Sequence, residues 1–203
     1  VYAANNGADV ISMSLGGYGR SLAQENALGY AYAFSMIVAS SGNDAICIRN
    51  DGKLCPDGTP PIPAYPAAYT FVLGVQATMQ NQSWNGYRVG FSNYDFDGPA
   101  YTDYADDFNY EVYAPGTTIM GGLPNNGFTY LSGTSMSAPH VAGAMALLKS
   151  AHKNQDINTL NAIIMNYAKP LTNANGDLYS LSRQGMGEMD IRAAIHARAA
   201  AIP

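Results

Sequence analysis

A serine within a run of small residues is the strongest candidate for chemistry in this chain. Ser135 lies in the segment LSGTSMSAPHVAGAMALL, residues 131–148, whose second half has the apolar pattern of a helix. A serine that precedes a helix usually caps it. It can instead be a nucleophile, because the free N–H groups and the positive dipole end of a helix stabilise negative charge there. The spacing alone leaves both roles open.

The neighbours of Ser135 fit the role of a nucleophile in part. Gly133 and Thr134 are small, so a substrate carbonyl can approach the backbone closely. The nucleophile elbow of the α/β-hydrolases is not present, because it requires glycine two residues after the serine and Ser137 stands there. A nucleophile at Ser135 would therefore belong to another architecture.

Two further polar segments follow apolar runs that are rich in β-branched residues. SLGG closes the run ADVISMSLGG at residues 8–17, and SSGND closes MIVASSGND at residues 36–44. Ligands of open α/β sheets bind at the carboxyl ends of the strands. We expect both segments to lie near a binding site, together with the segment around Ser135.

The elements that must position these segments are short strands and longer helices. Four short apolar runs predict buried strands and four longer segments predict helices. The strands are expected at residues 8–17, 36–44, 71–78 and 111–116, and the helices at 21–34, 136–151, 156–168 and 188–200. Strands buried on both faces, together with helices, indicate an α/β domain with a mainly parallel sheet.

Composition narrows the classes of function. The 203 residues are 47% hydrophobic and 12% charged, with a net charge of −5, which fits a folded domain with a core. No basic patch indicates a nucleic-acid partner, and no apolar run is long enough to predict a membrane span.

Val1 in place of Met, inside a helix-like segment, predicts that the chain is a processed or cut piece of a longer protein.

The two cysteines lie close together in CIRNDGKLC. Cys47 and Cys55 flank a turn-forming Asn-Asp-Gly, so a local disulfide that closes this loop is expected. A metal site is disfavoured because no second pair of Cys or His lies nearby. A disulfide predicts an oxidising compartment, so we expect a secreted or extracellular protein.

Longer motifs carry a resemblance to a family. GTSMSAPHVAGAMALL is similar to the serine motif of the subtilisin-like serine proteases, the subtilases. Other segments resemble further parts of that domain, in the family's order. They are GADVISMSLGG, VASSGND, YPAAYTFVLGVQAT, FSNY with VYAPG, and GMGEMDIRAAI. The resemblance implies the three-layer subtilisin-like α/β fold without its N-terminal strands. Residues 1–203 would then be the C-terminal portion of a single peptidase domain.

The resemblance also implies roles for individual residues. Ser135 matches the nucleophile that forms the acyl-enzyme, and Asn43 matches the side-chain donor of the oxyanion hole, with the Ser135 N–H as the second donor. The residues that match the substrate-binding segments are Ser14, Leu15, Gly16, Ser40, Ser41, Gly42, Ala64, Gly133 and Thr134. The methyl group of Ala64 would make the first specificity pocket shallower.

The general base is missing from the chain. The family's aspartate and histidine motifs, Asp-Thr-Gly or Asp-Ser-Gly and His-Gly-Thr, do not occur. His140 follows Ser135 by five residues and is expected to point away from it, and His152 and His196 have no motif around them. Either the parent protein is a serine endopeptidase and this segment alone is inactive, or the protein is a peptide-binding pseudoprotease that does not cut.

Partners and metals complete the expectations. Polypeptide substrates and the missing N-terminal half are the expected partners, and the truncated chain is expected to self-associate through the exposed edge of its first strand. No cofactor is required by the chemistry. Structural calcium is possible, because an acidic loop offers hard oxygen ligands. Its carboxylates are Asp95, Asp97, Asp103, Asp106, Asp107 and Glu111.

Overall fold

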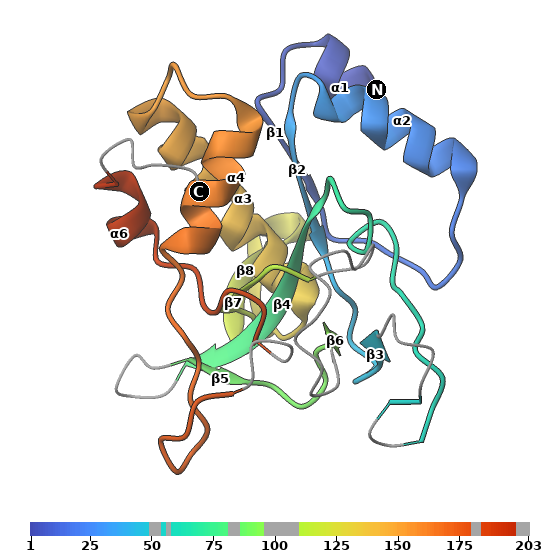
Figure 1. The fold of residues 1–203 in the computed structure, drawn as a ribbon, viewed down its shortest axis with the longest axis vertical. Helices are drawn as coiled ribbons and strands as arrows, with labels where there is room; N and C mark the ends of the chain where they lie inside the picture. The colour runs from blue at the N-terminus through green and yellow to red at the C-terminus, as the bar shows by residue number, and fades with distance from the viewer. Residues whose placement is uncertain (49–53, 56–57, 81–85, 96–109, 180–183, 198–203) are drawn as a thin grey trace.

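The computed structural model describes residues 1–48, 54–55, 58–80, 86–95, 110–179 and 184–197 (Figure 1). Its main sheet has five strands. The four parallel strands are β1 (Val10–Met13), β2 (Met36–Ser40), β4 (Leu73–Gln80) and β7 (Val112–Pro115), and β5 (Gly86–Arg88) pairs antiparallel with β4. The order is β1-β2-β4, with both β7 and β5 paired to β4. The predicted α/β class with a mainly parallel sheet is confirmed.

Helices cover both faces of this sheet, which gives three layers. Met36 and Val38 of β2 pack into a core with α3 (Thr134–Ala151), α4 (Ile157–Asn166) and α6 (Ile191–Ile195). Ile37 and Ala39 point to the opposite face, where α2 (Leu22–Tyr32) contributes Ala31 to a second core. A short helix α1 (Tyr2–Asn5) precedes β1. Strand β2 is buried at every residue because both of its faces are covered.

Side-chain caps fix the starts of three helices. Ser21 accepts a hydrogen bond from Gln24 N–H at the start of α2. Asp156 accepts from Thr159 N–H at α4, and Asp190 accepts from Ala193 N–H at α6. The last predicted helix was too long at its start. The chain enters it only after Asp190, because Glu188 is held in bridges to Tyr113 and Lys169.

The predicted strand at residues 8–17 was also too long. The ladder to β2 ends at Met13, and the chain continues outside the sheet until Gly17 pairs with Tyr65 in an isolated antiparallel bridge. Gly17 N–H donates to Tyr65 O at 2.9 Å, and Tyr65 N–H donates to Gly17 O at 2.8 Å. The polar segment after β1 is therefore fixed by a second contact rather than by the sheet.

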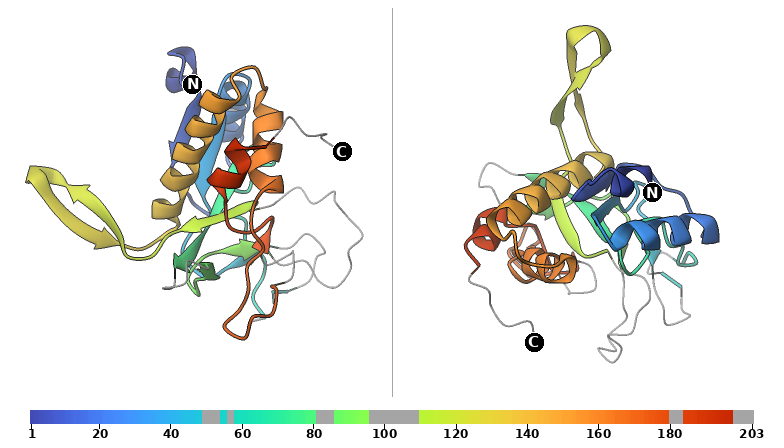
Figure 2. Two further views of the ribbon diagram at one scale, coloured as in Figure 1. Left: turned by 90° about the vertical axis from the view of Figure 1, so that its left-hand side faces the viewer. Right: turned by 90° about the horizontal axis from the view of Figure 1, so that it is seen from above.

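A hairpin that the sequence analysis did not predict projects from the body of the molecule (Figure 2). Strands β8 (Ile119–Leu123) and β9 (Gly127–Leu131) pair antiparallel, joined by the 3₁₀ turn η1 (Pro124–Asn126). Phe128 is 73% exposed, so the hairpin presents apolar side chains without burying them. The chain returns from β9 directly into the start of α3, which carries Ser135.

A small two-stranded sheet lies beside the main one. Strand β3 (Cys47–Ile48) pairs in parallel with β6 (Tyr94–Asp95). Cys47 and Cys55 are joined by a disulfide with a Cα–Cα distance of 6.0 Å. The bond ties the segment after β3 back to that strand, close to the loop that follows β2.

Candidate active site

Ser135 lies in the first turn of α3 and does not cap the helix. The helix begins at Thr134, and Gly133 is its N-cap residue. The predicted start at Met136 was two residues too late. The reason is a cap from elsewhere in the chain, because the Thr134 N–H donates to Asn43 Oδ1 at 2.8 Å. That contact satisfies an N–H that would otherwise lack a partner at the helix start.

Asn43 is held against the start of α3 by one end of its amide. Its Oδ1 accepts from both Thr134 N–H, at 2.8 Å, and Thr134 Oγ1, at 3.0 Å. Thr134 Oγ1 in turn accepts from Gly42 N–H at 3.1 Å. Nδ2 of Asn43 has no acceptor among the described residues, and the side chain is exposed. The amide therefore points its NH₂ group outward while its oxygen is fixed.

The Ser135 backbone N–H is a second unpaired donor beside this amide. The N–H before it is bonded to Asn43, and the N–H after it, on Met136, donates to Gly133 O at 2.9 Å. No described group accepts from Ser135 N–H, as is usual in the first turn of a helix. A Cβ at Gly133 would come within 3.3 Å of Asn43 Nδ2, so glycine keeps the space beside the amide open.

The segment after β1 contacts the same helix start. Ser14 Oγ donates to the carbonyl oxygen of Ser135 at 2.7 Å. That oxygen would normally accept from the N–H four residues later, but Pro139 occupies that position inside the helix and has no N–H. Ser14 therefore supplies the donor that the helix itself lacks.

The structure brings most of the predicted substrate-binding residues to one region. Leu15 and Gly16 continue from Ser14 and are exposed. Ser40 and Ser41 end β2 and are buried, so they line the interior of the region rather than its surface. Ala64 is also buried, and its N–H donates to Tyr110 Oη at 3.0 Å. Three segments thus meet where β1 and β2 end and α3 begins.

No histidine takes part in this arrangement within the described residues. His140 is exposed, and its Nδ1 lies 2.8 Å from Met136 O in its own helix. His152 Nε2 lies 3.2 Å from Ile195 O at the far end of α3, and His196 follows α6. The described chain therefore offers Ser135 no hydrogen-bonded general base.

The acidic residues considered for calcium are only partly described. Asp97, Asp103, Asp106 and Asp107 lie outside the described residues. Asp95 is buried, and the Glu111 carboxylate accepts from Gly74 N–H at 2.5 Å. Removal from water raises the pKa of Glu111 well above 4.5, although the bond from Gly74 opposes that shift. No group of three or more His, Cys, Asp or Glu that could hold a metal occurs in the described part of the chain.

One residue of this region was not singled out from the sequence. Asn93 precedes β6 and is 1% exposed, and its side chain is bonded to the loop that carries Asn43. The motif FSNY contains it, but nothing in the spacing indicates that contact.

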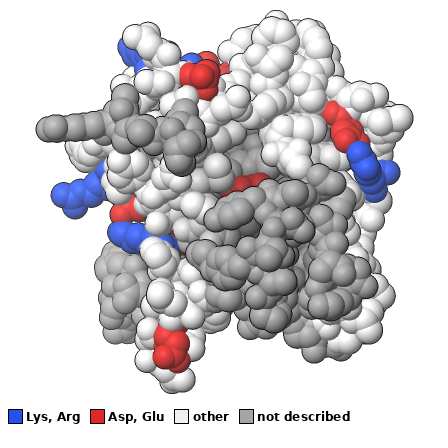
Figure 3. Space-filling model, viewed as in Figure 1, with Lys and Arg blue, Asp and Glu red and all other residues white. Residues whose placement is uncertain are grey.

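On the face seen in Figure 3 the described Lys and Arg side chains are scattered rather than gathered into a patch. Among the described helices, none has the length and hydropathy needed to cross a bilayer.

Most of this chain is similar in sequence to known proteins. A family model described as the subtilase family matches residues 1–187. Subtilisin DY of Bacillus licheniformis is 36% identical over 151 residues, which cover 74% of this chain and 46% of that protein. Thermitase of Thermoactinomyces vulgaris is 34% identical over 172 residues, covering 84% of this chain and 50% of thermitase. The chain therefore spans about half the length of these relatives.

Solved structures agree with the sequence comparison. The prenylagaramide maturation protease PagA superposes with a TM-score of 0.70 at 28% identity, over 96% of this chain and 63% of that structure. The superposition supports the same arrangement of sheet and helices in both molecules.

Proposed function

This chain belongs to the subtilase family, and on that premise we propose that it is the C-terminal portion of the catalytic domain of a serine endopeptidase. The observation that carries the proposal is the pair of unpaired donors at the start of α3. Asn43 Nδ2 and Ser135 N–H both lack acceptors among the described residues, and both lie at the start of the helix that carries Ser135. An oxyanion would satisfy them together.

In the proposed reaction Ser135 Oγ attacks the carbonyl carbon of a peptide bond and gives its proton to a histidine from outside this segment. The carbonyl oxygen becomes negative and accepts hydrogen bonds from Asn43 Nδ2 and Ser135 N–H. The amine leaves with the proton, and water then releases the acyl group from Ser135. One such donor contributes roughly 2.7–4 kcal/mol in subtilisin, a member of this same family.

The substrate class follows from the same region. Leu15 and Gly16 are exposed beside the helix start, so an extended polypeptide can lie along them and pair with their backbone. Ser40, Ser41 and Gly42 would form the wall of the pocket for the residue before the cut, with Ala64 at its base. Gly133 and Thr134 would let the substrate carbonyl approach the backbone closely. No cofactor enters the reaction, and the Cys47–Cys55 disulfide supports an oxidising, extracellular setting. Structural calcium in the acidic loop is tested by chelation, which should lower the melting temperature of the full-length protein if the ion is bound.

A labelling experiment separates this function from peptide binding without cleavage. The full-length protein and residues 1–203 alone are treated side by side with a fluorophosphonate probe. We expect labelling at Ser135 in the full-length protein, none in its Ser135→Ala variant, and almost none in the isolated segment. Loss of the histidine in subtilisin lowers kcat by about 2 × 10⁶, which is the expected scale for the segment.

A second variant tests the oxyanion role. Asn43→Ala in the full-length protein should lower kcat by about 10²–10³ with little change in KM, because the lost bond forms mainly in the transition state. A full-length protein that binds peptides but neither labels nor cuts them would favour the pseudoprotease. Rapid labelling of residues 1–203 alone would mean that a base is present in the segment.

A further inference from the structure

The side chain of Asn93 uses all of its hydrogen-bonding capacity. An asparagine amide offers two N–H donors and an oxygen that accepts two bonds. Its Oδ1 accepts from the N–H groups of Asp44 and Ile46, both at 3.0 Å. Its Nδ2 donates to Ser41 O at 2.9 Å and to Tyr18 Oη at 3.1 Å. The residue is 1% exposed, so water does not compete for these bonds.

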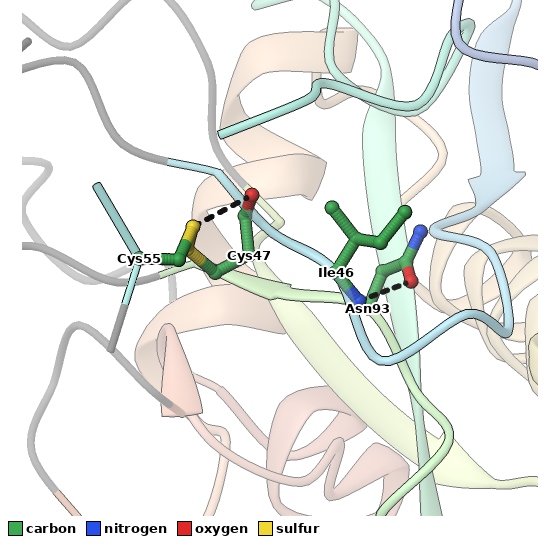
Figure 4. Close-up of a disulfide and its surroundings, with 4 residues drawn as sticks. All are labelled: Ile46, Cys47, Cys55 and Asn93. Atoms are coloured by element: carbon green, nitrogen blue, oxygen red, sulfur yellow. Dashed lines mark hydrogen bonds between the residues drawn. A yellow bond between two sulfur atoms is a disulfide. The ribbon is translucent and has the colours of Figure 1, made fainter. Parts of the chain in front are cut away.

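These bonds hold the chain both before and after Asn43. Residues 41–46 form no strand or helix of their own between β2 and β3, so their backbone groups need partners elsewhere. Ser41 precedes Asn43, whereas Asp44 and Ile46 follow it, and all three are bonded to the same amide. Figure 4 shows the bond to Ile46 beside the disulfide from Cys47. The loop is thus held at its centre by Asn93 and at its end by Cys47.

The backbone of Asn93 adds two contacts to the same loop. Its N–H donates to Gly42 O at 3.0 Å, and its carbonyl accepts from Ser41 Oγ at 3.4 Å. Gly42 has φ +102°, and a Cβ at that position would collide with Asn93 Nδ2. Asparagine at 93 therefore requires glycine at 42.

We infer that Asn93 is a positioning residue for catalysis, which fixes the amide of Asn43 where the oxyanion forms. The inference rests on the proposed function of Asn43 as an oxyanion donor. Among the described residues, no hydrogen bond joins Asn93 to Ser135. It acts by holding the loop so that Asn43 Oδ1 stays on Thr134 and Nδ2 stays free.

The same amide links this loop to the second substrate-binding segment. Tyr18 Oη accepts from Asn93 and donates to the Asp44 carboxylate. Tyr18 follows Gly17, whose bridge to Tyr65 fixes the segment that continues from Ser14. Removing the Asn93 amide would therefore loosen the oxyanion donor and one flank of the peptide-binding region together.

A double-mutant cycle in the full-length protein tests the inference. The turnover rate of each variant is divided by the concentration of active sites that fluorophosphonate titrates, so that kcat refers only to active molecules. Asn93→Ala should lower kcat about 10- to 100-fold, because displacement of a catalytic group by about 1 Å has effects of that size. In an Asn43→Ala background the same change should lower kcat less than about threefold, because the group that Asn93 positions is already gone. Equal fold-losses in both backgrounds would overturn the inference.

Two further variants separate positioning from general loss of structure. Asn93→Asp keeps the size and both accepting bonds but loses both donated ones, so its kcat should fall between those of the wild type and Asn93→Ala. Asn173 is the matched control. Its Oδ1 also accepts from two N–H groups of its own turn, those of Asn175 and Asp177, but that turn carries no site residue. Asn173→Ala should leave kcat per titrated site unchanged.

A crystal structure of the Asn93→Ala variant decides the inference without activity. We expect Asn43 Oδ1 to have left Thr134 N–H. Retention of that bond within hydrogen-bonding distance would overturn the inference even if catalysis had fallen. If the wild-type full-length protein neither labels nor cuts, the proposed function fails, and the crystal structure still shows whether Asn93 positions Asn43.

Discussion

The hydroxyl of Ser14 should stabilise the protein only as long as residue 139 is proline. Pro139 cannot donate to the Ser135 carbonyl, and its ring crowds that oxygen. Ser14 Oγ donates to it at 2.7 Å instead. A net hydrogen bond is worth about 0.5–1.5 kcal/mol, and Ser14 is exposed, so we place Ser14→Ala near 1 kcal/mol or below in free energy of unfolding.

Pro139→Ala changes the value of that bond. An alanine at 139 has an N–H four residues after Ser135, so the carbonyl regains its usual helical donor. In that background Ser14→Ala should lose less than about 0.5 kcal/mol. The two changes therefore couple, with an interaction energy of about 0.5–1 kcal/mol.

Guanidinium unfolding of the full-length protein measures this coupling. Every variant carries Ser135→Ala, which keeps the carbonyl and removes self-digestion. Ser150→Ala, an exposed serine near the other end of the same helix, serves as the control and should change stability by less than about 0.5 kcal/mol. An equal effect of Ser14→Ala in the proline and alanine backgrounds would refute the reasoning.

Three other predictions concern stability and assembly. Reduction of the Cys47–Cys55 bond should lower the free energy of unfolding by about 2–3 kcal/mol on the chain-entropy model, and an unchanged denaturation midpoint would contradict this. Burial alone would raise the pKa of Asp190, but its ion pair with Lys169, at 2.6 Å, and the Ala193 N–H hold it below its ordinary value of 3.8. The stability it contributes is present above that value and is lost as the pH falls through the folded pKa. Thermal unfolding between about pH 2 and 6 should therefore decline less steeply on the acid side for Asp190→Asn than for the wild type, and parallel curves would count against the ion pair. Residues 1–203 alone should self-associate, because β1 pairs on one side only among the described strands and Phe128 is exposed; a monodisperse monomer in light scattering would argue against it.

The four parallel strands of the main sheet could be placed from the sequence, but their ends could not. MIVAS is apolar because both faces of β2 are covered, and that requirement is visible in the residues themselves. The ladder stops at Ser40 because the chain then turns toward Asn93, which lies more than fifty residues further on. A contact of that separation leaves no local pattern.

The start of α3 was misplaced for the same reason. A helix start is read from a cap residue just before it, yet Thr134 is capped by Asn43 from another segment. The hairpin of β8 and β9 does have a local sequence signal, in its turn residues. Asn125 and Asn126 have φ of +62° and +58° and precede Gly127, a combination typical of tight hairpin turns. Gly121 and Gly122 in β8 weaken the alternation that would have identified the flanking strands.

The missing base, by contrast, could be read directly. It depends on which residues are present and not on how they are arranged, and no His-Gly-Thr occurs. The role of Asn93 could not be predicted from the sequence. Asparagine is common in turns, and only the four partners of its amide distinguish this one.

The bond between Asn43 and Thr134 has a consequence for how such a site can change during evolution. Active-site residues often destabilise the fold, so replacing them tends to yield a more stable but inactive protein. The oxygen of the Asn43 amide supports the first turn of α3, while in the proposed function its nitrogen binds the oxyanion. Helix caps of this kind contribute about 0.5–2 kcal/mol. Selection for stability and selection for activity therefore act on this residue in the same direction. Replacement of Asn43 in an inactive form would not increase the free energy of unfolding.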